Sequence, residues 1–151
     1  MEQWITIVAA AVGSAGFAFI FNAKKSQILC ATISGLLVSG MYLLLQSHYD
    51  SILLDNMLCA MLVTAYAEIF ARIMKAPSSV FLLPAIIPLV PGGFLYYTMY
   101  GLVTGANDFA WENANSTMLT GLGIAMGILV ISVIVSGVDM IKNSNTLPEQ
   151  Q

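Results

Sequence analysis

The chain has 151 residues, of which 58% are hydrophobic and only 9% are charged. Soluble domains average about 25% charged residues, so a globule of this composition could not keep its surface hydrated. Five Lys and Arg residues stand against eight Asp and Glu residues, a net charge of −3 that offers no basic surface to nucleic acid. These numbers exclude soluble enzymes, nucleic-acid binders and disordered scaffolds. They predict an all-α membrane protein.

Polar clusters divide the chain into five apolar segments. We predict one transmembrane helix in each, because about 20 apolar residues cross a bilayer. The predicted spans cover residues 4–21, 28–45, 52–74, 80–104 and 116–141. The connectors are residues 22–27, 46–51, 75–79 and 105–115. The whole chain, 1–151, is expected to form a single integral membrane domain.

The first segment is predicted to be a permanent span, because no Lys or Arg precedes Lys24 as a cleavable signal would require. Small residues three or four positions apart recur in the first, second and fifth segments. They are Ala9, Gly13, Gly16, Ala31, Gly35, Ser39, Gly123 and Gly127. Such spacing lets helix backbones approach closely within a membrane. We expect it to pack helices of this chain against one another, and a seam with another chain is the alternative.

The basic residues predict the orientation of the spans. With five spans, all of them fall on one side of the membrane: Lys24, Lys25, Arg72, Lys75 and Lys142. Lys and Arg are concentrated in cytoplasmic loops. The N-terminus is therefore expected outside the cell and the C-terminus inside.

The third segment carries a stripe of small or polar residues at helical spacing, which is expected to face protein. The stripe comprises Asn56, Ala60, Thr64, Ala67 and Ala71. Glu68 borders it and is the candidate proton-coupling residue, because ionisable groups within a membrane mark ion pathways. A structural ion pair with Arg72, one turn further on, is the alternative. Asp55 is expected only to complement the helix dipole in the first turn.

The fourth segment is interrupted in its middle by Pro84, Pro88, Pro91, Gly92 and Gly93. Each proline lacks an N–H group and clashes with the carbonyl four residues before it, so the Ile87 carbonyl, for example, is expected to lose its helical donor. Two adjacent glycines permit backbone conformations outside the helix. We predict a helix broken near the bilayer midplane, where discontinuous helices of transporters hold substrates and ions. A structural kink is the alternative.

This broken helix predicts a binding site. The second half-helix would begin near Gly93, where free N–H groups and the positive end of the dipole favour a carboxylate. Loose carbonyls of the first half would face a cation or an ammonium group, and two tyrosines one turn apart would add hydroxyl groups. The predicted substrate-binding residues are Pro88, Pro91, Gly92, Gly93, Tyr96 and Tyr100.

The rest of the chain offers little further chemistry. Asp139 and Lys142 are predicted to pair at the end of the fifth span. No metal or cofactor site is predicted, since His48 is the only histidine and lies in a loop. Neither a nucleophile triad nor a pair of catalytic carboxylates is present, so we expect no enzymatic activity.

The run Ile87-Pro88-Leu89-Val90-Pro91-Gly92, followed by Tyr96, resembles the threonine/serine exporter family. It is most similar to the small-subunit form, in which the exporter is split over two chains. Two further stretches agree with the resemblance. They are Gly16–Asn22 at the end of the first span, and Ala67-Glu68, Ala71-Arg72 and Pro77 at the end of the third. The likeness extends over about residues 10–140.

The resemblance implies export of small polar metabolites, notably threonine and serine. For the two-chain form it also implies export of dicarboxylates. It implies a proton-motive-force-driven secondary transporter in the cytoplasmic membrane. The implied partner is a larger membrane subunit with a cytosolic N-terminal domain. If that partner supplies five spans and begins inside the cell, the two chains would form inverted repeats around a shared midplane site.

Two other functions remain open on the residues alone. One is a membrane scaffold that assembles a partner without transporting anything, and the other is a homo-oligomeric channel. The broken helix favours transport, because a scaffold does not need a break. A channel should carry a polar stripe along one helix, and only the third segment has a partial one.

Overall fold

The computed structural model describes residues 2–46 and 51–144, and every regular element in this part of the chain is a helix. The α-helices are α1 (Glu2–Ile20), α2 (Lys25–Gln46), α3 (Ile52–Met74), α4 (Ser79–Ile86), α5 (Gly92–Thr104) and α6 (Asn107–Ser144). A short 3-10 helix, η1 (Ile87–Leu89), follows α4. The all-α fold predicted from the sequence is confirmed.

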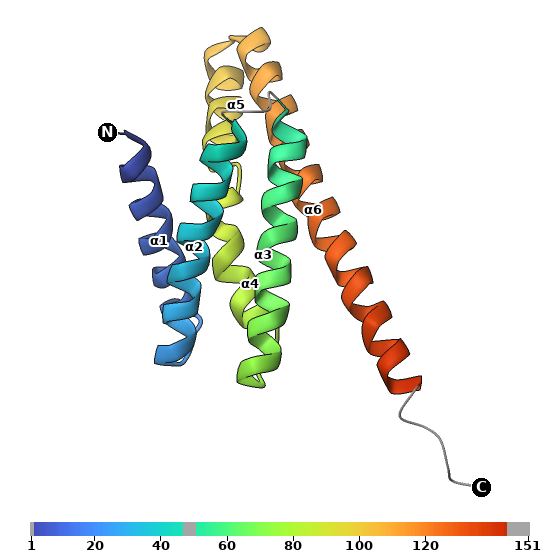
Figure 1. The fold of residues 1–151 in the computed structure, drawn as a ribbon. Helices are drawn as coiled ribbons and strands as arrows, with labels where there is room; N and C mark the ends of the chain where they lie inside the picture. Colours follow the sequence, from blue (N-terminus) through green and yellow to red (C-terminus); the bar gives the residue numbers. More distant parts are fainter. Residues whose placement is uncertain (1, 47–50, 145–151) are drawn as a thin grey trace, which may run out of the picture.

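The helices form an elongated bundle (Figure 1). Helices α1 to α4 lie side by side, and the α1–α2 and α3–α4 turns lie at the same end. Helix α5 continues from α4 toward the opposite end and forms a hairpin there with the start of α6. Helix α6 then returns along α3 and diverges from it toward its own C-terminal end (Figure 1).

Helices α1, α2 and α3 occupy the first three predicted segments, and the broken helix α4–η1–α5 occupies the fourth. The predicted connector over residues 105–115 is wrong, since α6 already begins at Asn107. Gly105 ends α5 in the left-handed conformation, with φ 76°, and the Ala106 N–H donates to the Gly101 carbonyl at 2.9 Å. The polar residues that suggested a loop bond their own helix instead. The Asn113 side chain, for example, donates to the Phe109 carbonyl at 2.8 Å.

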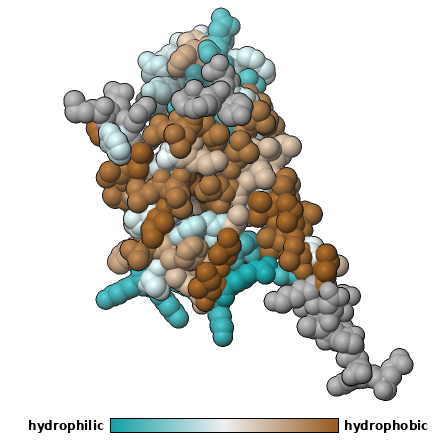
Figure 2. Space-filling view, in the orientation of Figure 1, coloured by the Kyte–Doolittle hydropathy of each residue, from teal (hydrophilic) through white to brown (hydrophobic). Residues whose placement is uncertain are grey.

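The surface is that of a multi-pass membrane protein. Figure 2 shows a broad apolar band between two hydrophilic ends. Three helices among the described residues, α2, α3 and α6, are long and apolar enough to cross a bilayer, and the bent pair of α4–η1 and α5 would make a fourth span. Helix α1 has a shorter apolar stretch, Trp4–Ile20. The two turns that carry Lys24 and Lys75 lie at the same end of the bundle (Figure 1).

Small residues of α2 and α6, but not the predicted glycines of α1, bring helices together as expected. A Cβ atom added to Gly35 would lie 2.6 Å from the Ser14 hydroxyl on α1, and one added to Gly127 would lie 2.5 Å from the Met57 carbonyl on α3. All five residues of the α3 stripe are buried. By contrast, nothing lies within 4 Å of a Cβ added to Gly13 or Gly16. The small residues of α2 and α6 therefore serve contacts inside this chain.

Candidate functional site

The predicted break lies between η1 and α5. Val90 is extended, with ψ 127°, and Pro91 caps α5 with ψ 52°. The axis bends by 49° between Ser79–Leu89 and Gly92–Thr104. Gly92 and Gly93 belong to α5, and Gly105 is the glycine with positive φ among the described residues. The expectation that the glycine pair supplies the non-helical backbone is therefore wrong. Val90 and Pro91 supply it.

The break changes which backbone groups are bonded. The Ile87 carbonyl loses its α-helical donor at Pro91, as predicted, and accepts the Val90 N–H at 3.1 Å instead. The Gly92 N–H turns back to the Val90 carbonyl at 2.7 Å. No side chain caps α5, and within the described chain the N–H groups of Gly93 and Phe94 have no acceptor. The helix therefore begins with two available donors at the positive end of its dipole.

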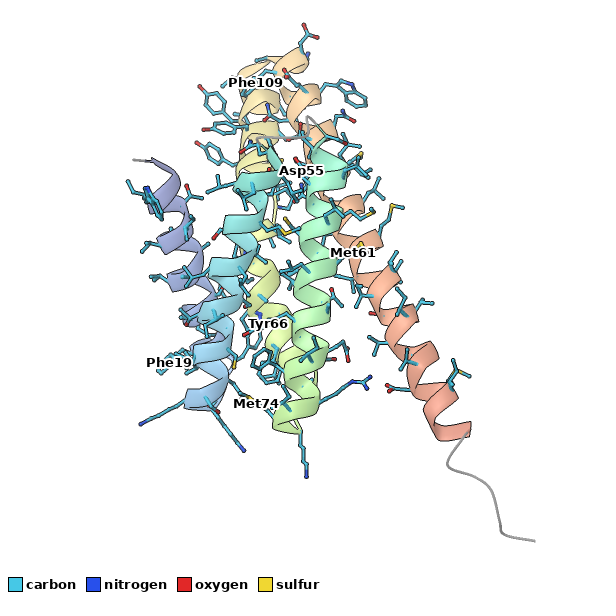
Figure 3. The ribbon with its side chains drawn as sticks, in the orientation of Figure 1. Phe19, Asp55, Met61, Tyr66, Met74 and Phe109 are labelled. Carbon is cyan, nitrogen blue, oxygen red and sulfur yellow. The ribbon has the colours of Figure 1, made fainter. Side chains whose placement is uncertain are left out.

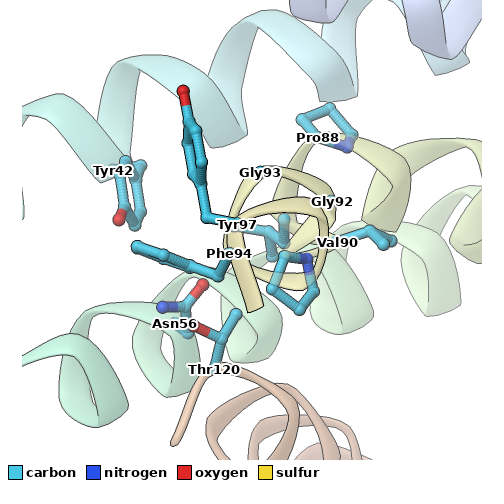
Figure 4. A pocket seen from close by; sticks show the side chains of 11 residues that line it. Tyr42, Asn56, Pro88, Val90, Gly92, Gly93, Phe94, Tyr97 and Thr120 are labelled. Carbon is cyan, nitrogen blue, oxygen red and sulfur yellow. The ribbon is translucent and has the colours of Figure 1, made fainter. Parts of the chain in front are cut away.

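These donors lie beside a cavity of about 260 Å³ (Figure 4). Four elements besides η1 contribute to its wall, namely α2, α3, α5 and α6. The lining residues are Tyr42, Asn56, Pro88, Leu89, Val90, Pro91, Gly92, Gly93, Phe94, Tyr97 and Thr120. A site of this kind suits a small metabolite, because it lies just below the range of about 300–1,000 Å³ usual for ligand pockets.

A second cavity lies on the other side of η1, between α1 and α2. It has a volume of about 440 Å³ and shares Tyr42, Pro88 and Leu89 with the first. Irregular backbone at membrane depth is tolerated where it is buried in protein or lines a cavity. The break in this chain meets that condition on both sides.

Four of the six predicted binding residues line the first cavity: Pro88, Pro91, Gly92 and Gly93. Tyr96 and Tyr100 do not line it. They are 65% and 54% exposed and stack on one another with ring centroids 6.4 Å apart. Tyr97 lies in the wall instead, with its ring edge-on to Phe109 of α6 at 5.9 Å. The sequence could not choose between Tyr96 and Tyr97, because each follows a glycine of the pair by one turn.

Two buried polar residues of the wall were not predicted to bind substrate. Asn56 is 2% exposed, and its side-chain nitrogen donates to the Ile52 carbonyl at 2.7 Å. Thr120 is 3% exposed, and its hydroxyl has no hydrogen-bond partner among the described residues. Asn56 belongs to the predicted stripe of α3, which marked it as facing protein. Thr120 gave no sequence signal, since only the fold brings α6 to the break.

Asp55 is more deeply buried than its predicted role in the first turn of α3 suggested. It is 4% exposed and lies near the upper end of α3 in Figure 3. No other charged residue among those described is buried. It precedes Asn56 but is not part of the cavity wall.

Glu68 lies away from the break, on the half of α3 from which α6 diverges. It lines a groove of about 390 Å³ between α3 and α6, together with Arg72 and apolar residues of both helices. Arg72 donates to Asp139 of α6 at 2.7 Å. In the described part of the chain no hydrogen bond or ion pair reaches Glu68, so the alternative Glu68–Arg72 pair is not formed. The predicted partner of Asp139 was Lys142, whose side chain lies outside the described residues, as does His48.

Comparison with known families identifies the relatives of this chain. The family model described as Threonine/Serine exporter, ThrE, matches residues 6–134. The chain belongs to the threonine/serine exporter family. The match includes every residue that lines the cavity at the break. No curated protein and no solved structure that was compared matches this threonine/serine exporter family member.

Proposed function

We propose that this chain is a membrane subunit of a secondary exporter that is driven by the proton-motive force. Its substrates are small polar metabolites such as threonine and serine, and a dicarboxylate is the alternative. The exporter family membership supports the class of function. The geometry of the break supports the location of the site.

One observation carries the proposal. The N–H groups of Gly93 and Phe94 have no acceptor among the described residues, and they stand at the start of α5 beside a cavity of about 260 Å³. Helix N-termini bind carboxylates through their N–H groups and the helix dipole. The substrate carboxylate would bind there, and Pro88, Pro91 and Gly92 would shape the wall around it.

Glu68 is the proposed proton-coupling residue. It lies in the groove between α3 and α6, where the diverging helices leave about 390 Å³ of space. Since Arg72 is engaged by Asp139, the Glu68 carboxylate is not held in an ion pair with Arg72. Ionisable groups at membrane depth are expected to have such a role.

The proposed topology has five spans, with the N-terminus outside and the C-terminus inside the cytoplasmic membrane. The position of both Lys-bearing turns at one end of the bundle supports it. It requires α1 to cross the bilayer despite its shorter apolar stretch. Single cysteines in a background without Cys30 and Cys59 would test it. An impermeant thiol reagent added outside should label Asn113→Cys and not Ser26→Cys, and external labelling of Ser26→Cys would reject the topology.

The proposed partner is the larger membrane subunit, with a cytosolic N-terminal domain, that the family resemblance implies. The proposal is tested by purifying the tagged full chain from its native membrane in mild detergent. A larger membrane protein should co-purify in a fixed ratio. A stable complex of this chain alone would favour the channel alternative.

Reconstitution tests the function itself. Proteoliposomes containing the purified chain and its co-purifying subunit are loaded with radiolabelled L-threonine or succinate, and a pH gradient is imposed. Efflux should follow the gradient and stop when a protonophore is added. An efflux rate that does not depend on the pH gradient would reject proton coupling. The absence of any efflux would favour the scaffold alternative.

A further inference from the structure

The Thr120 hydroxyl differs from the other threonine hydroxyls described on these helices. Five of them donate to the carbonyl four residues earlier, at 2.7 to 2.9 Å: Thr32, Thr64, Thr98, Thr104 and Thr117. This local bond is the usual way to satisfy a threonine within a helix. Thr120 is 3% exposed and does not form it, nor does any other described residue bond its hydroxyl. A buried hydroxyl without a partner loses free energy unless something else binds it.

The surroundings of Thr120 point to a ligand as that missing partner. Thr120 lies in the wall of the cavity that contains the start of α5, next to Asn56 of α3 (Figure 4). Asn56 uses its side-chain nitrogen for one bond to Ile52, which leaves its amide oxygen as an acceptor facing the same region. The buried Ser14 hydroxyl also lacks a partner among the described residues, but it is enclosed by the contact of α1 with Gly35. Thr120, in contrast, is one of the residues that line a cavity.

The composition of the wall limits what can bind. Among the described residues that line the cavity, none is charged. The start of α5 can bind one carboxylate. The described lining contains no Lys, Arg or His that could bind a second one. A hydroxyl group, which both donates and accepts, matches a threonine hydroxyl beside an amide oxygen. The volume of about 260 Å³ suits a molecule of a few heavy atoms.

We propose that Thr120 and Asn56 bind the side-chain hydroxyl of a small hydroxy amino acid whose carboxylate lies at the start of α5. This inference rests on the proposed function and makes it more specific, because it selects the hydroxy amino acid over the dicarboxylate. Thr120 is then the residue that distinguishes threonine from its analogue without the hydroxyl. A site built to bond a substrate hydroxyl discriminates strongly against the analogue that lacks it.

The test compares two ligands that differ only in that hydroxyl. Radiolabelled L-threonine bound to the full chain, purified with its co-purifying subunit, is displaced by unlabelled L-threonine or by L-2-aminobutyrate. The wild type should prefer L-threonine. Thr120→Val keeps the shape of the side chain and removes its hydroxyl. It should weaken L-threonine binding about three- to tenfold and change L-2-aminobutyrate binding less than about twofold.

Thr64→Val is the matched control, since Thr64 is equally buried on α3 but bonds its own helix and does not line the cavity. It should retain the wild-type preference, and so should Thr120→Ser. If Thr120→Val does not fold, Thr120→Ala removes the same hydroxyl without adding atoms and is expected to lose the preference. Equal weakening of both ligands, or of neither, in the valine or alanine variant would overturn the inference while the proposed function stands. Failure of the wild type to bind either amino acid would overturn both.

Discussion

Two pairs of glycines, Gly123 with Gly127 on α6 and Gly92 with Gly93 at the break, lie in opposite surroundings. A Cβ added to Gly123 would lie 2.6 Å from the Leu53 carbonyl, and one added to Gly127 would lie 2.7 Å from the Ala60 side chain. A Cβ added to Gly92 or Gly93 would meet nothing within 4 Å. Glycine is needed at the α3–α6 contact so that two backbones can touch. At the break it keeps space open beside the start of a helix.

The polar groups of the two regions differ in the same way. On α3, the buried Thr64 hydroxyl donates to the carbonyl of Ala60, which is itself in contact with α6, at 2.7 Å. At the break, the Thr120 hydroxyl has no bonding partner among the described residues. Nearly all buried polar groups in proteins are hydrogen-bonded, so unbonded ones call for an explanation. The first region holds the fold together, whereas the second leaves a buried hydroxyl that, in our proposal, bonds a ligand.

The largest expected effect follows from breaking the close contact. Gly127→Val would force a side chain against the Met57 backbone, 2.5 Å from the Cβ position. Overpacking of this kind costs about 1–3 kcal/mol or more, and backbone atoms cannot move aside as side chains do. We expect a clear fall in the melting temperature of the detergent-solubilised protein. Gly121→Val on the same helix is the control, because nothing lies within 4 Å of its Cβ position. Equal melting temperatures would show that the contact is not tight.

A second effect concerns coupling and should leave the fold intact. Glu68→Gln removes the ionisable carboxyl from the groove between α3 and α6, so efflux should no longer follow an imposed pH gradient. Asp139→Asn is the matched control. It breaks only the ion pair with Arg72, in which both side chains are 48% exposed, and such pairs contribute less than about 1 kcal/mol. If the Glu68→Gln variant still shows gradient-driven efflux, Glu68 is not the proton-coupling residue. Asp55, the buried carboxylate of the same helix, would then be the next candidate.

The smallest effect distinguishes Tyr42, which lines the cavity wall, from Tyr96, which lies outside it. Tyr42→Phe removes a hydroxyl from a residue that lines both cavities, and we expect substrate binding to weaken about two- to tenfold. Tyr96→Phe should change it very little, because Tyr96 is 65% exposed and does not line either cavity. Binding of radiolabelled substrate measures both. A larger loss with Tyr96→Phe would place the substrate on the exposed side of α5.

The parts of this structure that could be predicted are those with a local cause. The stripe from Asn56 to Ala71 follows from helical periodicity, and the break at Val90–Pro91 follows from prolines that remove backbone donors. The pairing of Arg72 with Asp139 joins residues 67 positions apart, so no local spacing could reveal it. Thr120 could not be predicted as a site residue for the same reason, since it is far in the sequence from the break that it lies beside in the fold. The sequence predicts a loop over residues 105–115 because polar residues favour loops, whereas α6 begins at Asn107. Polar side chains on an exposed helix surface are hydrated equally well, so their presence does not distinguish a loop from a helix.

The central claim is that the start of α5 is a substrate site and not a structural kink. The most direct measurement is substrate efflux from proteoliposomes containing the Gly92→Leu, Gly93→Leu double variant and its partner subunit. Both added side chains enter open space within this chain and both positions have helical backbone, so the chain should keep its fold, and assembly of the complex is checked in parallel. The leucines would cover the N–H groups of Gly93 and Phe94 and fill the cavity, so we predict that efflux is abolished. Full efflux by an assembled double variant would show that the substrate passes elsewhere.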